Sequence, residues 1–248
     1  MAFKHVLLAA AAAASVLGAV PAAAVQVVFA QIDLLDGNRN FLWARTTGSN
    51  ANLDTYNRST IGGTPVQFSL VGSPIPVSVL ATFTLSGATA GDPLGVSSGA
   101  FSQRVDNFGF NITTNSAFCF GPRCFAVGDS LLSGTVVNSA ITGTLGTRSA
   151  TLGGTNGTGS TISYSSPLLI FEPGVDYGFN FGLTNLDRNL SSLPNTALGS
   201  FRGQISGTFS ADPGGVFNVP EPGTWALMIA GMGLVGIARR RRRAVVAA

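Results

Sequence analysis

Histidine and lysine are almost absent from this sequence, because its one histidine, His5, and its one lysine, Lys4, both lie within the first five residues. Without histidine, the rest of the chain has no Ser-His-Asp or Cys-His nucleophile, no imidazole metal ligand and no ordinary proton shuttle for neutral pH. Without lysine, it forms neither a Schiff base nor a phosphate-binding P-loop. We therefore expect a non-enzymatic protein with no catalytic residue, cofactor or metal.

Charged residues are also scarce, at 10% of the chain, and the basic ones gather at its ends. Between Val25 and Val219, eight arginines stand against ten aspartates and glutamates, so this central part has a net charge of −2, although the whole chain has +3. A nucleic-acid-binding domain is expected to have a basic patch or stripe. This distribution predicts no nucleic-acid partner.

The first 24 residues have the pattern of a secretory signal peptide. Lys4 provides a positive start, residues 6–20 are apolar, and Ala22-Ala23-Ala24 form a small-residue cleavage site. The apolar run is shorter than the ~20 residues that a membrane-spanning helix needs. We expect a signal helix at residues 1–24, export by the Sec machinery, and removal of the helix by signal peptidase to leave Val25 as the first residue.

Only two cysteines are present, Cys119 and Cys124, in the stretch CFGPRC. Gly121 and Pro122 between them favour a tight turn, and in an exported chain the two thiols are expected to be oxidised. A redox pair is the alternative, but the spacing is not Cys-x-x-Cys, and two thiols without histidine make a poor zinc site. We expect a structural disulfide that closes a hairpin.

Residues 25–213 form one body in which apolar and polar residues alternate, with clusters of Gly, Asn, Asp, Pro and Ser about every ten residues. In FRGQISGTFS at 201–210, Phe201, Ile205 and Phe209 share one face of a strand. Other strands are predicted at 25–34, 41–46, 66–72, 77–85, 105–113, 130–137, 141–146, 162–171 and 176–185. The pattern predicts an all-β fold, an antiparallel β-sandwich of two sheets that is jelly-roll-like.

Three features follow one another at the C-terminal end of the sequence. A linker predicted at 214–223 contains Pro220-Glu221-Pro222, whose prolines favour the extended backbone that a protease binds. An apolar segment at 224–238, with Trp225 and Ala226 at its start, is predicted to form a short transmembrane helix. Five arginines within the predicted cytoplasmic tail, residues 239–248, would stop transfer across the membrane: Arg239, Arg240, Arg241, Arg242 and Arg243.

This order of parts, with PEPGTWA at residues 220–226, resembles the PEP-CTERM sorting signal in its PEPxxWA form. The resemblance implies export in a Gram-negative bacterium, transient anchoring in the inner membrane and cleavage near Pro220-Glu221-Pro222 by an exosortase, a membrane-embedded protease. It also implies delivery to the cell surface or to the extracellular matrix of a biofilm. The alternative is an ordinary tail anchor after a proline-rich linker. Residues 25–213 resemble no particular family.

Two hypotheses remain for the body. It is a non-catalytic surface or matrix protein that binds extracellular polysaccharide, with sugars stacking on aromatic side chains wherever these are exposed; the alternative for each aromatic is a place in the core. The aromatic candidates are Trp43, Tyr56, Tyr164 and Tyr177. Or it is a secreted glycosidase or lyase that uses paired carboxylates, which this composition still permits.

The candidate carboxylate pairs lie beside turn residues. Glu172 and Asp176 occur in FEPGVDY, and Asp33 and Asp36 occur in DLLDGNRN at residues 33–40. Carboxylates beside turns are more often solvated than catalytic, so both readings stay open. The oxygen-rich stretch 33–40 is also a candidate calcium loop, although its spacing does not match an EF-hand.

Overall fold

A computed structural model describes residues 26–57, 60–72, 77–89, 95–97, 99–192, 196–213 and 215–218. The predicted signal peptide, the Pro-Glu-Pro motif, the transmembrane helix and the arginine tail lie outside these residues. Among the helices of the described part, none is long and apolar enough to cross a membrane.

The regular secondary structure of the described residues consists of β-strands and a single turn of 3-10 helix, η1, at Asn156–Thr158. The strands, in chain order, are β1 (Val27–Leu34), β2 (Phe41–Arg45), β3 (Ala51–Asn57), β4 (Thr60–Ile61), β5 (Thr64–Leu70), β6 (Val77–Thr89), β7 (Gly95–Ser97), β8 (Ala100–Thr114), β9 (Phe118–Phe120), β10 (Arg123–Phe125), β11 (Ser130–Thr144), β12 (Ala150–Thr155), β13 (Thr161–Ser165), β14 (Leu169–Phe171), β15 (Tyr177–Thr184), β16 (Phe201–Ala211) and β17 (Val216–Asn218).

Thirteen of the strands belong to one large antiparallel sheet, which confirms the predicted all-β, antiparallel class. Hydrogen bonds link β1, β5, β6, β8, β11, β12, β15 and β16 in this order, and β16 pairs again with β1, so the sheet closes on itself. The prediction of two separate sheets is therefore corrected: the two layers are parts of one continuous sheet. Closure removes the unpaired edges that two separate sheets would expose.

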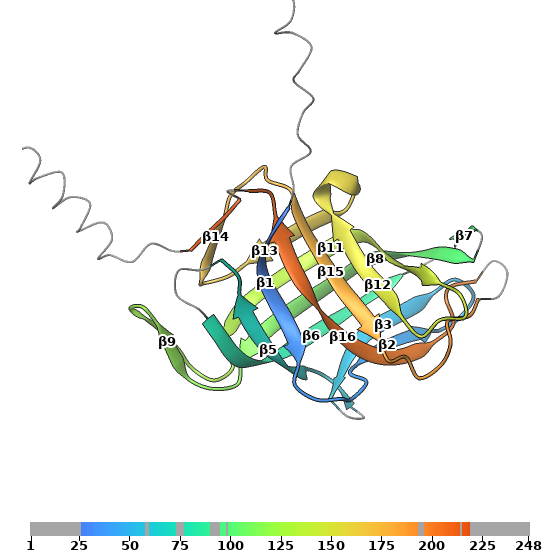
Figure 1. The fold of residues 1–248 in the computed structure, drawn as a ribbon, viewed down its shortest axis with the longest axis horizontal. Coiled ribbons are helices and arrows are strands. Elements are labelled where there is room, and N and C mark those ends of the chain that lie inside the picture. The colour runs from blue at the N-terminus through green and yellow to red at the C-terminus, as the bar shows by residue number, and fades with distance from the viewer. Residues whose placement is uncertain are drawn as a thin grey trace, which may run out of the picture.

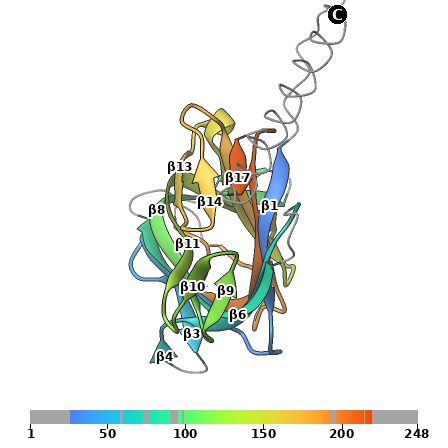
Figure 2. The same ribbon diagram turned by 90° about the vertical axis from the view of Figure 1, so that its left-hand side faces the viewer.

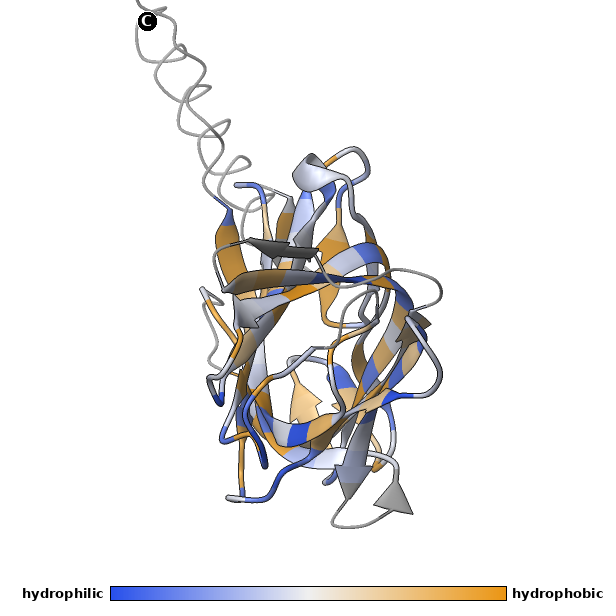
Figure 3. Ribbon diagram, turned by 90° about the vertical axis from the view of Figure 1, so that its right-hand side faces the viewer, coloured by the Kyte–Doolittle hydropathy of each residue, from blue (hydrophilic) through white to orange (hydrophobic). Residues whose placement is uncertain are grey.

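The two layers pack face to face around a core of aromatic and aliphatic side chains. Figure 1 shows β1, β16, β15 and β12 crossing in front of β6, β8 and β11. Rings from the two layers meet in the core. The ring centroids of Phe83 on β6 and Phe181 on β15 are 5.6 Å apart, and those of Phe110 on β8 and Phe209 on β16 are 5.1 Å apart. Apolar and polar positions alternate along the strands, as the bands of Figure 3 show, because one side of each strand faces this core.

Three long strands change partners along their length. β6 pairs first with β5 and then with β3, β11 pairs first with β13 and then with β12, and β16 pairs first with β2 and then with β1. In β11 the change occurs at Asn138, whose φ of 61° lies in the left-handed region that asparagine tolerates. These bends allow one sheet to wrap around the whole core.

Two small sheets of two strands each stand beside the main sheet, β9 with β10 and β14 with β17 (Figure 2). β17 lies within residues 214–223, which the sequence predicted to be a linker. Its residue Val216 pairs with Phe171 of β14, and Asn218 pairs with Leu169. Residues 216–218 thus pair with a strand of the body, because even three residues gain ladder hydrogen bonds where a partner strand is in reach.

Candidate functional site

The aromatic side chains considered for sugar stacking belong to the core. Trp43 is fully buried and donates a hydrogen bond from Nε1 to the Leu198 carbonyl at 2.9 Å. Tyr56 and Tyr177 are also buried. Tyr164 is half-buried, and its ring packs against Phe29 and Phe209. Of the two alternatives for these aromatics, a place in the core therefore holds for Trp43, Tyr56 and Tyr177, whereas Tyr164 packs on the core and remains half-buried.

Burial also raises the pKa of two tyrosine side chains. Burial raises the pKa of Tyr164 well above its usual value, while its hydroxyl donates to the Gly178 carbonyl at 2.7 Å. Burial, and then the negative charge of Glu172, raise the pKa of Tyr177, whose hydroxyl donates to the Glu172 carbonyl at 2.6 Å. Both hydroxyls are protonated at neutral pH and act as hydrogen-bond donors, Tyr164 between β13 and β15 and Tyr177 between β15 and the loop before it.

The pair Glu172 and Asp176 lies on the loop between β14 and β15. Glu172 is exposed and Asp176 is half-buried, and neither lines the groove described below. The backbone carbonyl of Asp176 accepts from the Asp212 amide at 3.0 Å, which positions the loop. Paired-carboxylate hydrolysis requires two carboxyl groups that face each other across a substrate site. This loop offers no such arrangement.

The pair Asp33 and Asp36 also has a local role. Asp33 is exposed at the end of β1, and its carboxylate accepts from Gln31 Nε2 at 3.2 Å. The Asp36 carboxylate accepts from the Asn38 backbone amide at 3.2 Å and from Asn40 Nδ2 at 3.0 Å, a pattern typical of a turn held by an aspartate side chain. No group of three or more His, Cys, Asp or Glu residues placed to hold a metal occurs in the described part of the chain.

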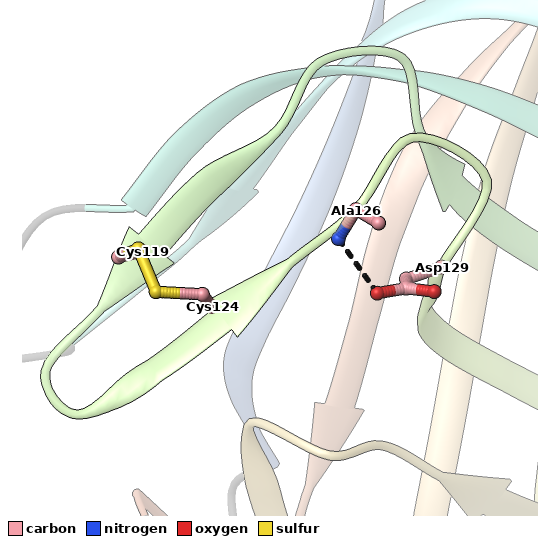
Figure 4. The surroundings of a disulfide bond; sticks show 4 residues. All are labelled: Cys119, Cys124, Ala126 and Asp129. Atoms are coloured by element: carbon pink, nitrogen blue, oxygen red, sulfur yellow. Dashed lines mark hydrogen bonds between the residues drawn. A yellow bond between two sulfur atoms is a disulfide. The ribbon is translucent and has the colours of Figure 1, made fainter.

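The predicted disulfide is present. Cys119 and Cys124 lie directly opposite each other on β9 and β10 and are bonded (Figure 4). The rings of Phe118 and Phe125 stack at 5.0 Å beside them. At the base of the hairpin, the Asp129 carboxylate accepts from the Ala126 amide at 2.7 Å (Figure 4). The bond joins two strands that the main sheet does not hold, so it is a structural staple for this projecting hairpin.

A shallow groove on the outer face of the sheet is the strongest candidate for a binding site. It has a volume of about 650 Å³ and runs across β3, β6, β8, β11 and β13. The sheet register places its outward residues in two rows. The first row is Asp54, Ser86, Gly109, Thr135 and Ser163, and the second is Thr84, Asn111, Ser133 and Ser165. Side chains two residues apart on a strand share a face, so both rows point to solvent while Phe108, Phe110 and Leu85 point to the core.

Polar side chains of the groove are held by hydrogen bonds between strands. Ser86 Oγ donates to the Asp54 carboxylate at 2.7 Å, and the hydroxyls of Thr135 and Ser163 lie 2.8 Å apart. Thr84 Oγ1 donates to the Asn111 carbonyl at 3.1 Å. A hydroxyl has one donor and two acceptor positions, so each keeps hydrogen-bonding capacity for a ligand.

This groove was not predicted from the sequence, and neither was β3, which carries Asp54, although strands were expected over parts of β6, β8, β11 and β13. The polar residues of 77–85, 105–113 and 130–137 alternate with the core residues and carry the signal of a solvated face. Their meeting in rows depends on the order and register of strands that are distant in the sequence. Neither property can be read from one sequence.

The sorting region adjoins the folded body directly. Asn218 is the last residue of β17, and Val219 alone separates it from Pro220. The exit of the chain is fixed where the Gly215 carbonyl accepts from the Glu172 amide at 3.1 Å and from the Tyr177 hydroxyl at 3.3 Å. The region recognised by a processing protease therefore begins within a few residues of β17.

Comparison with known proteins bears on this region. Residues 218–243 match the PEP-CTERM protein-sorting motif, and the match includes Pro220-Glu221-Pro222, Trp225, Ala226 and Arg239–Arg243. The resemblance noted in the sequence is thus confirmed. The motif implies an exported, surface-associated protein that is anchored by its tail and processed by an exosortase. No curated protein and no solved structure matches the chain, and no family is assigned to the body.

Proposed function

We propose that this chain is a non-catalytic protein of the cell surface or extracellular matrix, delivered by its sorting tail, whose β body binds extracellular polysaccharide. The observation that carries the proposal is the sorting motif at residues 218–243, which begins where β17 ends. A folded body joined directly to a removable anchor suits a protein that is released whole after one cut. In this scheme Pro220-Glu221-Pro222 is the recognition site, 224–238 the temporary inner-membrane anchor, and Arg239–Arg243 the stop signal.

A structural and binding role fits the chemistry of the body better than hydrolysis does. The exported part has no histidine or lysine. Of the two carboxylate pairs that hydrolysis would need, one has the Asp36 carboxylate holding a turn, and the other lies on a loop outside the groove. Among the described residues, the groove is lined by hydroxyl, amide and glycine groups together with Leu85, Phe110 and Tyr164, and Asp54 is the one carboxylate, so these residues offer hydrogen bonds without a second acid or base.

Replacing the recognition site tests the proposal. The wild-type chain and a variant with Pro220, Glu221 and Pro222 all changed to alanine are expressed in a Gram-negative host that has an exosortase, and the membrane and extracellular fractions are compared by immunoblot. We expect the wild type in the extracellular fraction and the variant in the membrane. A matched change of Pro213 to alanine, outside the motif, is expected to leave sorting unaltered. Equal release of both chains would contradict the proposal.

A further inference from the structure

We infer that the outer groove across β3, β6, β8, β11 and β13 is the polysaccharide site, and that it takes a neutral, hydroxyl-rich chain lying across the strands. This inference rests on the function proposed above and adds the site and the ligand class. The first evidence is that outward residues form a continuous row across the sheet. Asp54, Ser86, Gly109, Thr135 and Ser163 are direct register partners on five adjacent strands.

The row has the dimensions of an extended polymer and not of a small molecule. Adjacent strands are ~4.8 Å apart, so a row across five strands presents a polar group or an opening at each such step over ~19 Å. This repeat is comparable with one sugar unit of an extended polysaccharide. The second row, from Thr84 to Ser165, lies beside the first and supplies hydroxyl and amide groups along the same line.

Gly109 leaves room for a ligand at the centre of the row. A Cβ atom built at this position would meet nothing closer than the Gly134 carbonyl oxygen at 3.9 Å. The backbone of β8 is therefore bare between Ser86 and Thr135, and the C–H face of a sugar ring can lie on it. Glycine is common where a ligand approaches a strand closely.

The hydroxyl groups are positioned before a ligand arrives. Ser86 is held by Asp54, Thr135 is paired with Ser163, and Ser130 Oγ donates to the Asn111 side-chain oxygen at 2.6 Å. Groups that are already ordered lose less conformational entropy on binding, which favours affinity. Short side chains on paired strands thus make a rigid hydrogen-bonding surface, and half-buried Tyr164 also lines it.

Charge decides between neutral and acidic polymers. Among the described residues that line the groove, Asp54 is the only charged one. A uronic acid chain would bring its carboxylates close to this aspartate, which is unfavourable, whereas sugar hydroxyls can donate to it. The ligand class is therefore a neutral polysaccharide.

The test measures binding by the full-length protein in mild detergent. Its retardation is followed in native gels that contain hydroxyethyl cellulose, galactomannan or dextran, which are neutral, or alginate, which is a polyuronate. We expect retardation by at least one neutral polymer and none by alginate. Gly109→Trp, which fills the groove, is expected to weaken this binding by about tenfold or more. Asp54→Asn, which removes an ionic acceptor, is expected to weaken it by up to about tenfold.

Gly182→Trp on β15 is the matched control. Gly182 is also an outward, half-buried strand glycine, and a Cβ there would also meet only one atom at 3.9 Å, the Ser206 carbonyl oxygen. We expect this variant to bind like the wild type, and circular dichroism checks that both tryptophan variants are folded. Equal weakening by the two variants, preference for alginate, or no retardation by any neutral polymer would overturn the inference.

This experiment fails independently of the sorting experiment. Binding is measured on the purified chain whether or not its tail has been removed. A chain that is correctly sorted but does not bind contradicts the groove alone. A chain that binds but stays in the membrane with its tail contradicts the sorting scheme alone.

Discussion

At the scale of single residues, close contacts between neighbouring strands depend on glycine. Gly207 of β16 is the clearest case, because a Cβ there would lie 2.2 Å from the Asn180 carbonyl oxygen and 2.5 Å from Phe181 Cδ1. Both atoms belong to β15, which pairs with β16 at this point. Neither can move without disturbing the ladder, so the position excludes any side chain.

Gly207→Ala is therefore expected to lower the free energy of unfolding by about 1–3 kcal/mol, the usual range for overpacking in a closely packed region. Urea denaturation of the full chain in detergent measures this change. Gly182→Ala is the control, since its Cβ has 3.9 Å of room and alanine is more favourable than glycine within a strand. Equal stability of the two variants would contradict the steric role of Gly207.

The sequence predicted residue environments well where alternation is regular. Phe201, Ile205 and Phe209 are buried as expected. It left two alternatives open at Trp43 and Tyr177, because an aromatic residue suits either a core or a sugar platform and only the tertiary contacts distinguish them. The two rows of outward residues that form the groove were not predicted, since Ser, Thr and Asn on a strand indicate only a solvated face.

At the scale of elements, the predicted strands were displaced where the backbone bends. Residues 130–137 and 141–146 were expected to form two strands, and β11 spans nearly all of both. The left-handed Asn138 shifts the alternation, because Val137 and Asn138 are both exposed while Val136 and Ser139 are buried. Residues 162–171 were expected to form one strand, but they form two, because Ser166 and Pro167 separate β13 from β14.

The strand pair β14–β17 is the element on which processing depends. It has three residues on each strand and lies outside the main sheet, so it is expected to open locally without unfolding of the body. Val219 alone separates it from Pro220, whereas a protease needs an extended segment on each side of its cut. We therefore expect release of β17 to accompany cleavage.

A reversible cross-link tests this coupling. Ile170 and Phe217 are register partners, so the double variant Ile170→Cys with Phe217→Cys can bond β14 to β17. We expect the oxidised double variant to be cleaved several times more slowly than the wild type, and reductant to restore the rate. The two single cysteine variants control for the substitutions and for reduction of Cys119–Cys124. Cleavage of the cross-linked chain at the wild-type rate would contradict the expected opening.

At the scale of the whole molecule, the fold is one closed sheet with a groove on its outer face and a sorting signal at its exit strand. The antiparallel all-β class followed from the alternation and the turn residues. The closure of the sheet could not be predicted from the sequence. The pairing β1–β16 joins segments that are far apart in the sequence, and the pairing β6–β8 depends on how the long strands bend. The sorting tail was predictable because its parts are contiguous and ordered.

The most direct test of the account is the intact mass of the protein recovered from the extracellular matrix of a host that has an exosortase. The account predicts a chain that begins at Val25, ends near Pro220-Glu221-Pro222 and retains the Cys119–Cys124 bond. Such a chain would hold the complete β body, including β17, and no membrane anchor. A protein found only in the membrane fraction, with a mass that still includes Arg239–Arg243, would contradict it.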